Sequence, residues 1–121
     1  MAMMLTAFGT LGMVGVIWMV QLVQYPGLAH VGEAEFKTHH AHHCAQISWV
    51  VIPLMFAELG GSLWLLAMSP AQIPVWSLWL GVALVLGVWV STFMVQVPQH
   101  GRLSKGFDRA TIQQLVAGNW I

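Results

Sequence analysis

Histidine is concentrated in one short segment of this chain. Four of its six histidines fall between residues 39 and 43, in the run His-His-Ala-His-His. On a helix, His39 and His43 are one turn apart on one face, and His40 lies three residues before His43 on that face. Two imidazoles at such spacing can hold one transition-metal ion if a further ligand comes from another part of the chain.

The two remaining histidines are the natural further ligands. His30 follows the segment Gln24-Tyr25-Pro26, and His100 follows the similar segment Gln96-Val97-Pro98. These segments close the first and third apolar stretches, so both should lie at the same face of a membrane. The candidate metal ligands are therefore His30, His39, His43 and His100.

An alternative for the histidine run stays open. The sequence contains neither an H-E-x-x-H nor a C-x-x-C motif, so the spacing suggests a transition metal without specifying one. The histidines of a polar interfacial helix could instead face water and lipid headgroups. A haem is not expected, because membrane haems are usually held by histidines deep inside helices, and no histidine here lies deep in an apolar stretch.

Glu58 is a further candidate functional residue, because it is a carboxylate in an apolar segment. It lies in the middle of an apolar run, residues 47–68, where an unpaired carboxylate would be costly. Eighteen residues separate it from His40, about 27 Å along a helix, so the two cannot share one ion. Glu58 is therefore a candidate catalytic acid inside a helix bundle or a hydrogen-bonding tie to another helix.

Two polar stripes predict a pocket between helices. Each carries a tryptophan and at least one glutamine at a helical spacing of three or four residues, near the end of the first or third apolar stretch. The stripes are Trp18, Gln21 and Gln24, and Trp89, Thr92 and Gln96. Amides in hydrocarbon need partners, so helix–helix hydrogen bonding is one interpretation. The other is a ligand pocket with Trp18 and Trp89 at its floor, Gln24 and Gln96 on its walls and histidines at its rim, which would suit a flat aromatic molecule.

The composition indicates an integral membrane protein. Of 121 residues, 58% are hydrophobic and only 7% are charged, against roughly 25% charged residues in soluble domains. The formal net charge is zero, so no nucleic-acid partner is expected and the lipid bilayer is the predicted surrounding. Cys44 is the only cysteine, which excludes an internal disulfide.

Membrane helices should carry these residues. We predict a single all-α domain over residues 1–121, with full spans near residues 3–24, 45–68 and 75–97. Pro26-Gly27 should stop the first span and Pro98 the third. A short amphipathic helix should occupy the first loop and run into the second span. The stretch 110–121 is too short to cross, so we expect a fourth helix cut short by the end of the sequence.

Basic residues predict the orientation. Lys37, Arg102, Lys105 and Arg109 all lie in the first and third loops, and the second loop has none. Because positive residues stay on the cytoplasmic side, both loops should be cytoplasmic and the N-terminus outside, in a bacterial inner membrane.

Small residues recur every four positions on two spans. Ala57 and Gly61 do so on the second, and Ala83, Gly87 and Ser91 on the third. Helices approach closely at such residues in lipid. The stripes predict tight packing within the bundle, or a contact with another copy or with a larger membrane complex.

The order of motifs along nearly the whole chain resembles a known family. The motifs are Gln24-Tyr25-Pro26, Val31-Gly32, Phe36, His40, His43, Pro53, Glu58, Trp89, Ser91-Thr92, Gln96-Val97-Pro98, His100, Leu103, Gly106-Phe107-Asp108, Leu115-Val116 and Asn119-Trp120-Ile121. The pattern is similar to small bacterial four-helix integral membrane proteins related to anthrone-oxygenase-like proteins. The resemblance implies a completed fourth span after Ile121, and its characterised branch implies cofactor-free oxygenation of polycyclic aromatic anthrones.

Two classes of function follow as expectations. In the first, the chain is a membrane oxidoreductase in which His40, His43 or His100 removes a proton from a hydrophobic aromatic substrate, with oxygen then attacking the carbanion. In the second, it is a non-catalytic accessory or structural subunit of a larger membrane complex. Metal binding or transport by the histidine run is a third alternative.

Overall fold

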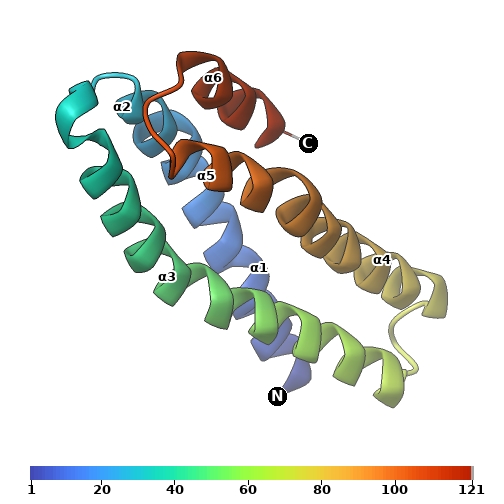
Figure 1. Cartoon of the computed structure of the whole chain (residues 1–121). Coiled ribbons are helices and arrows are strands. Elements are labelled where there is room, and N and C mark those ends of the chain that lie inside the picture. Colours follow the sequence, from blue (N-terminus) through green and yellow to red (C-terminus); the bar gives the residue numbers. More distant parts are fainter. Residues whose placement is uncertain (121) are drawn as a thin grey trace.

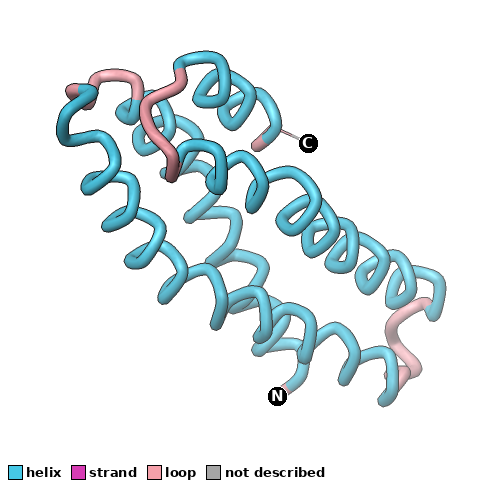
Figure 2. The backbone as a smooth tube through the Cα atoms, in the orientation of Figure 1, coloured by secondary structure: helices cyan, strands magenta, loops and turns pink. Residues whose placement is uncertain are grey.

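The computed structural model describes residues 1–120 and shows a chain built from helices (Figures 1 and 2). In order, the elements are α1 (Ala2–Met19), η1 (Val20–Gln24), α2 (Tyr25–Leu28), α3 (Glu33–Met68), α4 (Val75–Ser91), η2 (Thr92–Gln96), α5 (Val97–Leu103) and α6 (Arg109–Gly118). The two η elements are single π-helical turns.

Three long helices dominate the fold. α1, η1 and α2 form one helical run, Ala2–Leu28; α3 forms the second; and α4, η2 and α5 form the third, Val75–Leu103. Each is long and apolar enough to cross a membrane. Large apolar side chains such as Met4, Leu11 and Trp49 are exposed on their outer faces, as expected for a surface in contact with lipid. The predicted all-α fold with three long apolar helices is confirmed.

The first and third long helices extend further than predicted. Pro26-Gly27 does not end the first, which continues to Leu28, and Pro98 does not end the third, which continues to Leu103. A proline lacks an N–H, and its ring collides with the carbonyl four residues earlier in a regular helix. Here each proline follows a π-helical turn, η1 before Pro26 and η2 before Pro98, and each turn ends at the glutamine two residues before the proline. The wider turn accommodates the proline ring.

The second long helix is continuous. α3 begins at Glu33 and ends at Met68, so the amphipathic segment with the histidines and the second span are two parts of one helix. Pro53 lies inside it. Gly32 precedes the helix in an extended conformation, and Ser69 ends it with a left-handed backbone (φ 39°).

α1 and α3 are packed closely along their length and run in opposite directions (Figure 1). Glycines permit the approach. A Cβ at Gly9 would lie 2.6 Å from the backbone nitrogen of Glu58, and a Cβ at Gly61 would lie 2.7 Å from the backbone nitrogen of Thr6. The predicted role of Gly61 in helix packing is therefore confirmed.

The stretch predicted as a partial fourth span forms the short helix α6. It lies across the end of the bundle at which α2 and α5 meet (Figure 1). Its apolar face completes a buried cluster drawn from every long helix: Val20, Tyr25, Leu28, Phe36, Leu103, Ile112 and Leu115. Ile121 lies outside the described residues.

Asp108 caps the N-terminus of α6. Its carboxylate accepts hydrogen bonds from the backbone N–H of Ala110 and from the hydroxyl of Thr111. The Thr111 bond is the main reason that the pKa of the exposed Asp108 carboxyl lies below its ordinary value. The cap therefore stabilises the docked helix above that pKa and loses this contribution as the pH falls through it.

Candidate functional site

The candidate site lies at the end of the bundle covered by α6. His40 and Cys44, one turn apart on α3, meet His100 on α5. His40 Nε2 lies 3.0 Å from His100 Nδ1, and Cys44 Sγ lies 3.5 Å from His40 Nε2 and 3.7 Å from His100 Nδ1. Residues far apart in the sequence thus place two imidazoles and a thiol within contact distance of one another.

Two aromatic residues hold this group in place. The hydroxyl of Tyr25, at the start of α2, lies 3.2 Å from His100 Nε2. Tyr25, His100 and His40 therefore form a continuous hydrogen-bonded chain across three helices, and the direction of its protons depends on the histidine tautomers. Phe36 stacks on the other side of His40, with ring centroids 5.8 Å apart and planes 12° apart.

His43 is buried beside this chain. Its side chain is 7% exposed, and its ring centroid lies 6.0 Å from that of His100 and 6.3 Å from that of Tyr25. Among the described residues, its Nε2 has no hydrogen-bond partner. A buried imidazole nitrogen without a partner is costly, so this nitrogen is available to a ligand or to water.

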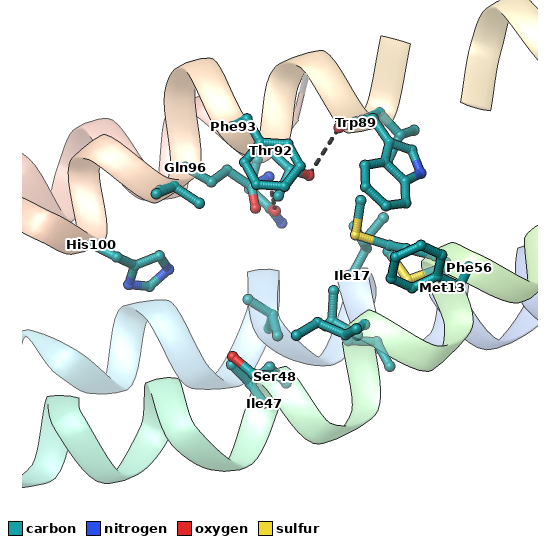
Figure 3. A pocket seen from close by; sticks show the side chains of 18 of the residues that line it. Met13, Ile17, Ile47, Ser48, Phe56, Trp89, Thr92, Phe93, Gln96 and His100 are labelled. Carbon is teal, nitrogen blue, oxygen red and sulfur yellow. Dashed lines mark hydrogen bonds between the residues drawn. The ribbon is translucent and has the colours of Figure 1, made fainter. Parts of the chain in front are cut away.

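A cavity of about 360 Å³ begins at His100 and Tyr25 and extends between α1, α3 and α4 (Figure 3). Most of its wall is apolar, with Met13, Val16, Val51, Met55 and Val88 along its length. Its size falls within the usual range for small-molecule sites, roughly 300–1,000 Å³.

Few polar groups on the cavity wall are available to a ligand. The hydroxyl of Ser48 donates to the backbone oxygen of Cys44, and that of Thr92 donates to the backbone oxygen of Val88. The indole N–H of Trp89 is buried and has no hydrogen-bond partner within residues 1–120. A bound molecule would therefore meet one histidine–tyrosine pair, one indole N–H and the hydrogen-bonded amides of Gln96 and Asn119 in otherwise apolar surroundings.

The structure separates the residues predicted for the pocket into two groups. Trp89 and Gln96 line the cavity. Trp18 instead faces a second hollow, of about 630 Å³, between α1 and α4, where its ring meets Trp120 edge-on at 5.7 Å. Gln24 is half-buried and lines neither hollow. The predicted common floor of Trp18 and Trp89 is therefore not formed.

The candidate metal ligands also divide. His43 and His100 lie at the site, whereas His30 and His39 are exposed on the surface and are not part of the group. His40, predicted as a catalytic residue, takes the place that the sequence assigned to His39. The reason is rotation about α3: the face with Phe36, His40 and His43 is turned into the bundle, so His39 is turned out.

Two residues of the site were missed in the sequence. Cys44 follows His40 by four residues and so shares its helical face, a spacing that could have identified it. Tyr25 lies in the segment that predicts the end of the first span. Its position between Gln24 and Pro26 becomes informative only once the helix is known to continue through the proline.

Two glutamines of the predicted stripes, Gln21 and Gln96, bind α6 or the residue that follows it, Asn119. Gln21 is buried; its amide donates to the backbone oxygen of Val116, and its oxygen accepts from the side chain of Asn119. Gln96 donates to the other side of Asn119 at 3.4 Å. The helix–helix hydrogen bonding that the sequence left as an alternative is thus present in this network.

Glu58 lies apart from the site. It is 8% exposed and accepts a 2.7 Å hydrogen bond from the hydroxyl of Thr10 on α1. Fifteen residues of helix, about 22 Å of rise, separate it from His43. The contact supports the interpretation of Glu58 as a tie between helices.

Replacing Thr10 with valine should lower the free energy of unfolding by about 1 kcal/mol, because interhelical hydrogen bonds in membranes are worth roughly 0.6–1.7 kcal/mol. Glu58→Gln should cost less, since the amide oxygen can still accept the bond. Denaturation in mixed detergent micelles measures both, with Thr38→Val at an exposed position of α3 as the control. A catalytic role for Glu58 would instead appear as lost turnover in Glu58→Gln at unchanged stability.

Comparisons of the chain with protein-family models, with curated proteins and with solved structures give no match.

Proposed function

We propose that this chain is a membrane protein that binds a flat hydrophobic molecule in the cavity and abstracts a proton from it with the Tyr25–His100–His40 chain. One observation carries the proposal: an apolar cavity ends on a histidine hydrogen-bonded at both ring nitrogens. Imidazole is the side chain whose proton affinity suits proton transfer near neutral pH.

The hydrogen-bonded chain supplies the groups needed for such a step. When His40 Nε2–H donates to His100 Nδ1, His100 Nε2–H can donate to Tyr25, and the phenol proton is left for a ligand oxygen. In the opposite direction, the phenol donates to His100 Nε2 and His100 Nδ1–H donates to His40 Nε2. The proton of His40 is then on its other ring nitrogen. Tyr25 is the end of the chain that lines the cavity, so a ligand carbonyl beside it would accept the phenol proton. His100 lies in the middle of the chain, and it would take a proton from an acidic C–H or O–H when one of its two hydrogen bonds opens.

The cavity would be loaded from the lipid. Ile52, Phe56, Phe93 and Val97 belong to its wall and are also exposed on the outer surface of the helices. In a bilayer these side chains meet acyl chains, so an apolar molecule would enter without crossing water. The buried Trp89 indole would provide a hydrogen-bond donor or a ring face inside.

Oxygenation follows from the resemblance to anthrone-oxygenase-like proteins. An anthrone is a flat tricyclic ketone whose ring CH₂ loses a proton to a base. The carbanion would then react with dioxygen, with one oxygen atom retained as the new ketone and the other released as water. The histidine takes up and returns the proton, and no electrons pass to the protein.

His100→Ala should reduce the rate of oxygen uptake with anthrone at least about 100-fold, because general-base catalysis typically contributes that factor or more. The assay uses the purified full chain in detergent and an oxygen electrode. His42→Ala is the matched control, since His42 is on α3 but exposed. Equal rates in wild type, His100→Ala and a protein-free blank would contradict the proposal.

The proposed location is a bacterial inner membrane, with the N-terminus outside and the site near the cytoplasmic face. The four basic residues lie at the α6 end of the bundle, which supports this orientation. Reporter fusions after Met1 and after Met68 should both report the outside, and a fusion after Lys105 should report the cytoplasm.

A role as an accessory subunit is the second candidate. The hollow between α1 and α4 is lined by Ala83, Gly87 and Ser91, and a Cβ at Gly87 would meet no atom of the described chain within 4 Å. Such an open small-residue face suits another membrane helix, from a second copy or from a different protein. Co-purification in mild detergent with a partner of fixed stoichiometry would favour this role over catalysis.

A further inference from the structure

We propose that His40, Cys44 and His100 form a binding site for one Zn²⁺ ion, held by two imidazole nitrogens and one thiolate with a fourth position open. The inference goes beyond the proposed function but uses two of the same residues. An ion at His40 Nε2 and His100 Nδ1 would replace the hydrogen bond between them, so the metal-bound and proton-transferring states of the site exclude each other. It concerns a different set of ligands from those that the histidine spacing predicted.

The distances between the ligand atoms fit a tetrahedral ion. With Zn–N of about 2.0 Å and Zn–S of about 2.3 Å, tetrahedral geometry places two nitrogens about 3.3 Å apart and nitrogen and sulfur about 3.5 Å apart. The corresponding separations are 3.0 Å for His40 Nε2 to His100 Nδ1, and 3.5 and 3.7 Å from these atoms to Cys44 Sγ. A shift of a few tenths of an ångström would complete the geometry.

Without an ion, these three atoms share one good hydrogen bond, that between His40 and His100. His40 Nε2 and His100 Nδ1 can share only one proton, and a thiol is a weak donor at 3.5–3.7 Å. Three mutually close lone-pair donors are what a metal ion requires. The separation of ligands over α3 and α5 also means that the ion would join two long helices.

Tyr25 provides a second, independent indication. Metal-bound histidines usually donate their other ring N–H to a nearby acceptor, which fixes the tautomer. The Tyr25 hydroxyl lies 3.2 Å from His100 Nε2, the nitrogen that would not hold the ion. With Nε2–H donating to Tyr25, the Nδ1 lone pair points at His40 and Cys44.

His43 lies beside this group of three. It is buried, its Nε2 has no partner within the described chain, and its ring lies 6.0 Å from that of His100. Its nitrogen is outside the close group of three, so it would face a water or a ligand bound to the ion, or reach the ion after a side-chain rotation. Catalytic zinc sites have this composition of three protein ligands and one exchangeable position.

The test is a metal titration of the purified full chain, with no polyhistidine tag, stripped with a chelator and kept reduced. One Zn²⁺ should bind per chain. Co²⁺ used as a probe should give the intense visible bands of a tetrahedral ion and a near-ultraviolet thiolate-to-metal band. Cys44→Ser should lose the thiolate band and lower the affinity at least about 100-fold, because a ligand matters more than the outer partners, whose loss typically costs 10–100-fold.

Exposed histidines on the same helix supply the controls. His39→Ala and His42→Ala should leave both affinity and spectrum unchanged, since neither side chain is part of the group. Loss of binding in these variants but not in Cys44→Ser would assign the ion to the surface run and overturn the proposal. The proposal would also be overturned if the wild type showed no saturable binding and Cys44→Ser were as stable as the wild type. The group would then contain only a histidine–histidine hydrogen bond. No substrate enters this titration, so its failure and that of the oxygen-uptake test are distinguishable.

Discussion

Replacing Gly9 with leucine should separate α1 from α3 and lower the free energy of unfolding by at least about 2 kcal/mol, at the upper part of the range for overpacking. The reason is backbone contact. Even a Cβ at this position would lie 2.6 Å from the nitrogen of Glu58 and 2.9 Å from its Cα. A side chain could move aside, but the backbone in the middle of α3 cannot do so without displacing the whole helix.

The matched control is Gly15→Leu on the same helix. A Cβ there would meet no atom of the described chain within 4 Å, so the side chain would point into lipid. Helix content at 222 nm and thermal denaturation in detergent measure both variants. Equal denaturation temperatures for the two would contradict the close α1–α3 contact, and a loss confined to Gly9→Leu would confirm it.

The close contact between α1 and α3 also positions Glu58, the only carboxylate in the apolar run of residues 47–68. Glu58 lies opposite Gly9, and the hydroxyl of the next residue, Thr10, donates to it. The glycine brings α1 near enough for the threonine to satisfy the acid. The sequence indicated that Glu58 needed a partner but could not identify it, because the partner depends on the relative height of two antiparallel helices.

Hydropathy predicted the number and approximate position of the long helices because a bilayer imposes a length on each. It did not predict their ends. Pro26 and Pro98 are strong stop signals in ordinary helices, but here each follows a π-helical turn, η1 or η2, and the helices continue. The extra turns matter, since α2 carries Tyr25 and α5 carries His100.

The histidines were predicted as a group, but the choice among them needed the helix face. Phe36, His40, His43 and Ile47 recur at helical spacing and lie against the bundle, whereas His39 and His42 lie outside that stripe. An apolar residue before and after the run could have identified the inward face. The partner His100 could not be placed, because its position depends on the end of α5.

Removing the Phe36 ring should have a large effect on both the fold and the site. Its side chain is fully buried and lies between His40, on which it stacks, and Phe107, which it meets edge-on with centroids 5.3 Å apart. Phe36→Ala should lower the free energy of unfolding by about 3 kcal/mol, the lower end of the range for a buried phenylalanine. Phe8→Ala, at an exposed position of α1, should change it little.

The same substitution should loosen His40 while leaving every proposed ligand in the chain. His40 would keep its bond to His100 but lose the ring that restricts its rotation, and Phe107 would no longer be held against α3. Below the lowered denaturation temperature, Phe36→Ala should therefore retain one Zn²⁺ per chain with affinity reduced about 10-fold or more, the usual cost of losing an orienting neighbour. Unchanged affinity in a destabilised variant would show that Phe36 supports the fold alone and that α3 by itself positions His40.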